Sequence, residues 1–280
     1  MGSKAKMWLR SPNDELWLFK SVRGDAERAE DWPEKAASEL AAAFVIPAAR
    51  VELAVRDGER GVISLSVTRG LDLVHGNELL FAQDPQYEKD QPRPAEGYSL
   101  AAVRAALADC APPPGWPESD WAAEDVFTGY LIFDALIANQ DRHHENWAAL
   151  VDVVKGTRAL SPSFDHASSL GFMLTDEDRL TRLTTSDRGR TVQRWAERGR
   201  SLFEGRPSLV DLAYDALTAC SATARDHWVG RIRMLEPSAW ESILARLPRS
   251  RVSEAACNFA AEVMSVNRGR LLDACSRLDS

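Results

Sequence analysis

The segment NQDRHHEN, residues 139–146, decides how this sequence is interpreted. It follows a stretch from Tyr130 to Ile137 that is apolar on nearly all sides, which predicts a buried helix. It precedes residues 147–164, where two apolar-rich stretches flank the turn dipeptide Lys155-Gly156 and predict a β-hairpin. The polar segment therefore lies between a rigid helix and a hairpin that returns the chain close to its starting point.

Three oxygen-bearing side chains are expected to meet at one end of this hairpin. Asp141 and Asn146 precede it, and Asp165 follows it in the string SPSFDH. Phosphoryl transfer needs a carboxylate that accepts the proton of the attacking hydroxyl, and hard oxygen ligands for Mg²⁺. Asp141 and Asn146 have the DxxxxN spacing with which protein kinases place their base and one metal ligand, and a second metal-binding Asp follows later in such chains.

The first 70 residues are rich in predicted strands. The expected elements are a hairpin of residues 6–10 and 15–20, a helix from Asp31 to before Pro47, and strands at residues 51–56 and 61–68. After them, residues 84–97 carry three prolines and predict an exposed loop. The remainder is mainly helical by its apolar spacing.

A kinase also needs a strand lysine for the α- and β-phosphates and a glutamate from the following helix. Lys20 ends an apolar row on the second predicted strand. Glu39 lies in the helix EKAASELAAAF and shares a face with Ala36 and Ala43, so we expect it to turn inward and pair with Lys20. Each feature is common alone, but their order along the chain favours a kinase.

These features predict an α+β protein with a bilobal, protein-kinase-like fold. We expect a small β-rich N-lobe of residues 1–70 and a large, mainly helical C-lobe of residues 71–280. A chain of 280 residues that is 45% hydrophobic can bury a sizeable core. No apolar run approaches the about 20 residues that a membrane span needs, and the N-terminus shows no secretory signal, so we expect a cytoplasmic protein without membrane contact.

Charge and cysteine usage exclude other classes. The net charge of −8 and a pI of about 5.3 argue against general binding of nucleic acid through its phosphate backbone. Four cysteines lie far apart with no CxxC spacing, so we expect reduced, buried thiols rather than a zinc site or a disulfide framework. They are Cys110, Cys220, Cys257 and Cys275.

NQDRHHEN followed by SPSFDHASSLG resembles the HipA-like kinases, whose catalytic segment reads NxDRHxxN and whose metal-binding Asp follows a short β-hairpin. The string DRHxxN is also familiar from phosphatidylinositol 3- and 4-kinases. WLFK resembles the lysine strand of the HipA-like family, EKAASELAAAF its glutamate helix, and ISLSVTRGLDLVHGNELL its hinge region. The resemblance covers residues 1–200 and implies a serine/threonine protein kinase that uses ATP and Mg²⁺.

The resemblance also implies roles for individual residues. Asp141 would be the catalytic base, with Asn146 and Asp165 as Mg²⁺ ligands. Lys20 would hold the phosphates and Glu39 would orient Lys20. The other implied nucleotide-contacting positions are Ser66, Val67 and Thr68 at the hinge, His143 beside the phosphates, and Gly2 and Ser3 in a remnant of the glycine-rich phosphate loop.

The same resemblance implies partners. A protein hydroxyl is the expected acceptor, and a small DNA-binding antitoxin is a hypothetical partner. Full-length HipA proteins carry an N-terminal subdomain ahead of the phosphate loop, so we expect a shorter, stand-alone member. The string HASS follows Asp165 where other kinases have Phe-Gly, so a DFG-type flip is not expected. Residues 174–190 occupy the place of an activation segment, and we expect a solvated polar loop there rather than a phosphorylation switch.

Other functions stay open at this point. A metal-dependent hydrolase would use a cluster of His and carboxylate side chains to activate water, although this hypothesis leaves Lys20 and Glu39 unexplained. A lipid or small-molecule kinase and an inactive nucleotide-binding module also fit the motifs. The hydrolase cluster would comprise Asp141, His143, His144, Asp165 and His166.

Overall fold

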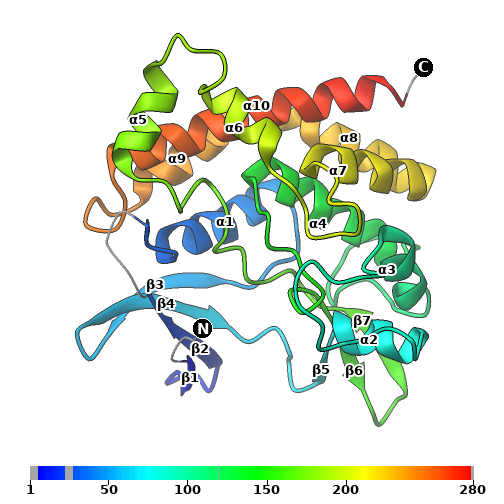
Figure 1. Ribbon diagram of the computed structural model, residues 1–280. Coiled ribbons are helices and arrows are strands. Elements are labelled where there is room, and N and C mark those ends of the chain that lie inside the picture. The colour runs from blue at the N-terminus through cyan, green and yellow to red at the C-terminus, as the bar shows by residue number, and fades with distance from the viewer. Residues whose placement is uncertain (1–5, 23–27, 119, 279–280) are drawn as a thin grey trace.

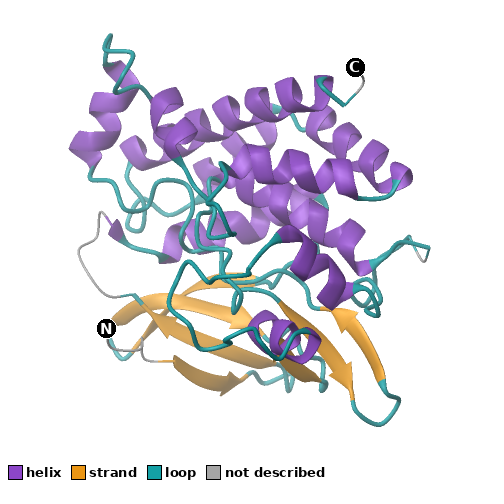
Figure 2. Cartoon of the chain, turned by 45° about the vertical axis from the view of Figure 1, so that its right-hand side comes forward, coloured by secondary structure: helices purple, strands orange, loops and turns teal. Residues whose placement is uncertain are grey.

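The computed structural model describes residues 6–22, 28–118 and 120–278. Within them, two antiparallel sheets lie at one side of the molecule and most helices gather at the other (Figures 1 and 2). The first sheet has the strand order β1-β2-β4-β3. Its strands are β1 (Lys6–Arg10), β2 (Leu16–Ser21), β3 (Val51–Arg56) and β4 (Glu59–Leu65). The hairpins predicted from the turns SPND and Asp57-Gly58 are therefore confirmed.

The second sheet contains β5 (Asp72–His75), β6 (Ala148–Asp152) and β7 (Thr157–Leu160), in the order β5-β6-β7. Strands β6 and β7 form the hairpin predicted around Lys155-Gly156. Residues 66–71 carry the chain from the first sheet to the second. The predicted lobe boundary at residue 70 falls in this connection and stays a prediction.

Helix α1 (Asp31–Phe44) joins the first sheet to the helical part of the molecule. Pro33 fits its first turn, and Val45 ends it in the left-handed conformation with a φ of 62°. Phe44 stacks on Phe133, at a centroid distance of 6.4 Å, and on Trp228, at 6.1 Å. The last turn of α1 is thereby buried against two other helices.

The remaining helices surround α4, which is buried on nearly every side, as its apolar sequence predicts. The long α10 crosses the face of the molecule away from the sheets (Figure 1). The helices are α2 (Gly76–Gln83), α3 (Leu100–Leu107), α4 (Ala123–Ile137), α5 (Asp176–Thr184), α6 (Val192–Arg198), α7 (Leu209–Ala219), α8 (Ala222–Met234), α9 (Pro237–Arg246) and α10 (Glu254–Ser276).

The polar segment 174–190 is not the continuous solvated loop that we expected, because α5 forms within it. The Thr175 side chain accepts a hydrogen bond from the Asp178 amide, and three acidic residues in the first turn complement the helix dipole. Arg179 is 1% exposed and donates to the carbonyls of Gly171 and Phe172. One buried arginine therefore fixes α5 to the preceding loop.

Two compositional predictions can be compared with the structure. All four cysteines are buried thiols outside any disulfide, as expected. Among the described helices, none is both long and apolar enough to cross a membrane.

Close packing of α4 on α8 gives a first test. A Cβ atom at Gly129 would overlap the ring of Trp228, which is fully buried, whereas a Cβ at Gly269 of α10 would meet open space. Gly129→Ala is expected to lower the free energy of unfolding by about 1–3 kcal/mol because the core is overpacked. Gly269→Ala, the matched control, should be neutral or stabilise by up to about 1 kcal/mol. Urea denaturation measures both, and equal effects would contradict this packing.

Candidate active site

A buried ion pair holds the segment NQDRHHEN against α4. Arg142 donates from Nε to Asp134 Oδ2 at 2.7 Å and from Nη2 to Asp134 Oδ1 at 2.9 Å. Both side chains are 3% exposed. The same guanidinium donates to the carbonyl oxygen of Asn146 at 2.6 Å and to Ser163 Oγ at 2.9 Å. Arg142 thus ties together the helix, the loop and the strand end that precedes Asp165.

The sequence reasoning did not single out Asp134 or Arg142. The available signal was an aspartate within an otherwise apolar helix, because a buried carboxylate needs a charged partner. Asn139 also belongs to this buried hydrogen-bond network, and its structural role was not predicted either. It donates from Nδ2 to Asp134 Oδ1 at 2.7 Å, and its Oδ1 accepts from the Asp141 amide at 3.2 Å.

Asp141 emerges from this scaffold with a side chain that is 37% exposed. Burial raises the pKa of its carboxyl group above the ordinary value, and the Arg93 guanidinium opposes this shift while the Asp165 carboxylate adds to it. Arg93 Nη1 lies 3.6 Å from Asp141 Oδ1. Asp141 and Asp165 are therefore electrostatic neighbours, as the hairpin geometry predicts.

Asn146 also contacts the Asp141 segment. Its Nδ2 donates to the Asp141 carbonyl oxygen at 2.8 Å. Because the amide nitrogen makes this bond, the amide oxygen is the atom that Asn146 can offer to a cation.

Lys20 is the point where the two halves of the site meet. Its Nζ lies 2.9 Å from Glu34 Oε1 and 3.1 Å from Asp165 Oδ1. Burial by itself would lower the pKa of the ammonium group, but the two carboxylates outweigh it and raise the pKa above its ordinary value. Lys20 is therefore a charged lysine held between two anions, with only 12% of its side chain exposed.

The expected pairing of Lys20 with Glu39 is wrong. Glu39 binds Lys35 at 3.0 Å and Arg246 at 2.5 Å, whereas Glu34 is 4% exposed and pairs with Lys20. Five residues of an α-helix turn the side chain through about 140°, so the two glutamates cannot share a face. Extending the buried stripe Ala37, Ala41, Phe44 back by one turn would have led to Glu34.

Asp165 has a left-handed backbone with a φ of 60°. The preceding Ser163 bridges to the segment that follows α1: Ala49 N donates to Ser163 O, and Ser163 N donates to Pro47 O, both at 2.8 Å. Backbone hydrogen bonds thus connect the loop that contains Asp165 directly to the segment after α1, the helix that carries Glu34.

The three histidines of the hydrolase hypothesis have different surroundings. His144 Nδ1 lies 2.7 Å from the Tyr87 hydroxyl, and His166 Nε2 lies 2.7 Å from Ser163 Oγ, both in the interior. His143 accepts at Nδ1 from the Glu145 amide at 3.1 Å, and burial lowers its pKa to about 3. All three imidazoles are buried.

The predicted five-residue metal cluster does not form. In the described part of the chain, metal-type ligands converge in one group, whose donor atoms lie within 4.8 Å of one another. It consists of His143, His144 and Glu145, and leaves out both aspartates and His166. The Glu145 carboxylate in that group already accepts from Arg93 Nη2 at 2.9 Å.

The predicted hinge lies where β4 ends. Ser66 N donates to the Leu16 carbonyl at 2.8 Å, and the Ser66 and Thr68 hydroxyls are 2.9 Å apart. Val67 lies between them, and none of the described residues makes a hydrogen bond to its backbone. Gly2 and Ser3, predicted in the phosphate loop, lie outside the described residues.

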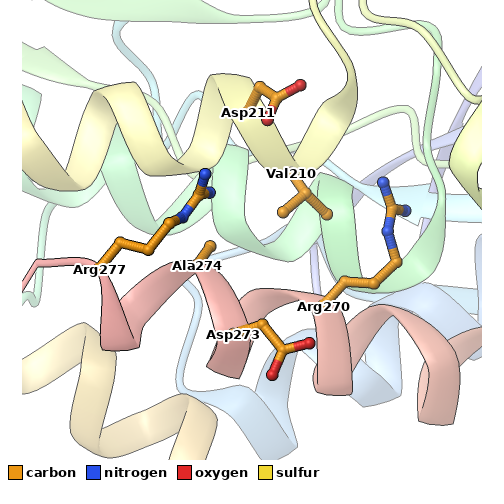
Figure 3. A pocket seen from close by; sticks show the side chains of 6 residues that line it. All are labelled: Val210, Asp211, Arg270, Asp273, Ala274 and Arg277. Atoms are coloured by element: carbon orange, nitrogen blue, oxygen red, sulfur yellow. The ribbon is translucent and has the colours of Figure 1, made fainter.

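A shallow hollow of about 370 Å³ lies elsewhere, between α7 and α10 (Figure 3). It contains two arginines and two aspartates and includes none of the predicted site residues. Its lining consists of Val210, Asp211, Arg270, Asp273, Ala274 and Arg277.

Three features of this chain are together typical of a protein-kinase-like fold. They are a strand lysine paired to a helix glutamate, a polar loop after a buried helix, and an aspartate after a hairpin. The chain belongs to the HipA-like C-terminal domain family, whose model matches residues 1–228. No curated protein sequence matches it. The family resemblance and the α+β, bilobal fold predicted from the sequence are thereby confirmed.

Two solved structures resemble this fold. One is the Helicobacter pylori proinflammatory kinase CtkA, with a TM-score of 0.73 and 18% identity, covering 97% of this chain and 93% of CtkA. The other is HipA of Shewanella oneidensis MR-1, solved with HipB and its operator DNA, with a TM-score of 0.58 and 13% identity. That match covers 99% of this chain and 64% of the HipA chain.

The buried imidazole of His143 makes stability depend on pH. Its pKa is about 3 when folded, against 6.5 ordinarily, so the unfolded state takes up a proton first as the pH falls. The stabilisation that the neutral His143 imidazole contributes to the folded state is complete above about pH 6.5, and it is lost progressively as the pH falls from there to about pH 3. We expect a loss of about 2 kcal/mol from this group between about pH 6.5 and pH 5. Urea denaturation at several pH values measures it, and His143→Gln should flatten the profile; an unchanged profile would contradict the assignment.

Proposed function

We propose that this protein is an ATP-dependent kinase that transfers the γ-phosphate to a serine or threonine hydroxyl of a protein, with Mg²⁺ as the metal. One observation carries the proposal: Lys20 binds both Glu34 and Asp165, and Asp141 lies near Asp165. These four residues come from four separate segments, in the order in which kinases place their phosphate lysine, its glutamate, the base and the metal aspartate.

The donor set fits magnesium and a nucleotide. Asn146 can offer an amide oxygen and Asp165 a carboxylate, both hard oxygen ligands of the kind Mg²⁺ prefers. Bound there, Mg²⁺ would neutralise charge on the nucleotide phosphates. The Lys20 ammonium, charged and held beside Asp165, supplies a fixed positive partner for the α- and β-phosphates.

Asp141 is the proposed base. Its carboxylate accepts the proton of the acceptor hydroxyl as that oxygen bonds to the γ-phosphorus and the bond from phosphorus to the ADP oxygen breaks. Burial raises its pKa, which makes the carboxylate a stronger proton acceptor, while its partial exposure leaves room for the acceptor.

Two further groups would contact the nucleotide. The backbone amide and carbonyl of Val67, to which no described residue makes a hydrogen bond, would bind the adenine edge at the hinge, between the Ser66 and Thr68 side chains. His143 accepts a hydrogen bond at Nδ1, so its neutral ring carries the proton on Nε2 and can donate to a phosphate oxygen.

The proposed phosphate acceptor and the proposed binding partner are inferred from the similarity to the two solved structures. CtkA is named a kinase, and the Shewanella HipA was solved together with HipB and operator DNA. On that basis we propose a protein substrate, and a small DNA-binding protein as partner, for a cytoplasmic kinase. A lipid or small-molecule acceptor and an inactive nucleotide-binding module are the alternative outcomes of the assays below.

The revised lysine partner gives a paired test on one helix. Glu34→Gln removes the carboxylate that fixes Lys20, and loss of a charge-assisted hydrogen bond of about 1.5–3 kcal/mol should lower kcat/KM for ATP about 10- to 150-fold. Glu39→Gln, the matched control on the opposite face, should stay within about 2-fold of wild type. Transfer from labelled ATP to a generic acceptor and to the protein itself measures both. Equal losses would contradict the assignment of Glu34.

The base is tested by Asp141→Asn. Removing the proton acceptor should lower kcat by about 10²- to 10⁴-fold, while nucleotide-induced thermal stabilisation is retained. Asp109→Asn, at an aspartate whose side chain is 86% exposed, is the control and should behave as wild type. Stabilisation by Mg-ATP without any transfer by the wild type would indicate an inactive nucleotide-binding module instead.

A further inference from the structure

Helix α1, which carries Glu34, is held from outside by three arginines of the C-terminal part of the chain. Arg231 comes from α8, Arg246 from α9, and Arg251 from the connection between α9 and α10. All three follow residue 228, where the family match ends. They contact α1 at its end, its middle and its beginning, and α9 packs alongside α1 (Figure 1).

The contact at the beginning of α1 is an ion cluster of Asp31, Arg60 and Arg251. Asp31 is fully buried, with Arg60 Nε at 3.0 Å and Arg251 Nη1 at 2.7 Å from its Oδ2. Arg60 Nη2 lies 2.9 Å from Asp31 Oδ1 and also donates to the Arg251 carbonyl at 3.1 Å. One carboxylate thus accepts from a strand of the first sheet and from the C-terminal connection.

Arg251 joins a further element to this cluster. Its Nη2 donates to the carbonyl of Ala54 in β3 at 3.0 Å, and its side chain is 12% exposed. Two outward nitrogens of one planar guanidinium therefore connect α1 and β3 to the C-terminal part.

The other end of α1 is held by backbone contacts. Arg231 donates from Nη2 to the Ala43 carbonyl at 2.8 Å and from Nε to the Phe44 carbonyl at 3.3 Å. These carbonyls have no partner within the helix, and a cation at this end complements the helix dipole. Midway, Arg246 binds Glu39. Both ends of α1 are therefore fixed to the C-terminal part of the chain, one end through α8 and the other through the connection between α9 and α10.

We propose that the C-terminal part of the chain, through Arg251, positions α1 so that Glu34 reaches Lys20. Asp31 lies three residues before Glu34, on the same first turn of α1, so fixing the Asp31 carboxylate fixes the turn from which Glu34 projects. In kinases the lysine-glutamate pair must be in place for phosphoryl transfer. Arg251 is then a positioning residue, and residues after 228 set the activity of a site built from residues before it.

The activity arm of the test rests on the proposed kinase function and uses a double-mutant cycle. Arg251→Ala should lower kcat/KM for ATP about 10-fold in the wild-type background and cause no further loss in the Glu34→Gln background, because the effect acts through Glu34. Arg251→Lys keeps a cation near Asp31 but cannot also bridge to the Ala54 carbonyl as the guanidinium does, so it should recover part of the loss. Arg268→Ala is the matched control, since the hydrogen bonds of Arg268 to described residues go to the carbonyls of Ile232 and Arg233 in α8 and not to α1.

A second arm does not depend on activity. Amide hydrogen exchange across residues 31–44 should be faster in Arg251→Ala, and in Arg231→Ala if the first variant fails to fold, but unchanged in Arg268→Ala. An equal loss of activity in both backgrounds, or unchanged exchange in α1, would overturn the proposal. A wild type that transfers no phosphate refutes the kinase function alone, and the exchange arm still decides whether these arginines hold α1.

Discussion

The ion pair between Arg142 and Asp134 is the interaction on which the rest of the site depends. It is buried, bidentate, and extended by bonds to the Asn146 carbonyl and to Ser163. A buried charge left without its partner costs about 3–5 kcal/mol, so neither residue can be lost without disturbing the loop. Asp141, Asn146 and Asp165 are thus presented by one rigid polar core and not by three independent loops.

The same core connects to the other half of the molecule. Ser163 accepts from Arg142 and exchanges backbone hydrogen bonds with Pro47 and Ala49, just beyond α1. Lys20 adds a second connection between the two halves, because it forms ion pairs both with Glu34 on α1 and with Asp165, two residues beyond Ser163. The relative placement of Lys20 and Asp165 is therefore determined by short, mostly buried contacts.

Most of the fold was predictable because strands, turns and the buried helix leave local signals. The hairpins, α1 and α4 follow from alternation, from turn dipeptides and from an apolar surface on every side. The partner of Lys20 was not predicted, because Glu34 looked like an ordinary acidic residue of a first helical turn while Glu39 lay among alanines. Arg142 and Asp134 were missed because spacing along the chain does not show which buried charges meet in space. The helix α5 was missed because its polar sequence depends on one buried arginine for anchorage.

The position of Lys20 between two carboxylates also bears on the order of binding at this site. Without ligand, the ammonium is already neutralised by Glu34 and Asp165, and Asp141 adds a further negative charge close by. A polyphosphate that enters alone would meet more negative than positive charge. A divalent cation bound at Asp165 would cancel that excess of negative charge, so that the Lys20 ammonium could pair with the phosphates. Cation and nucleotide would then each raise the affinity for the other by the same factor, as thermodynamic linkage requires.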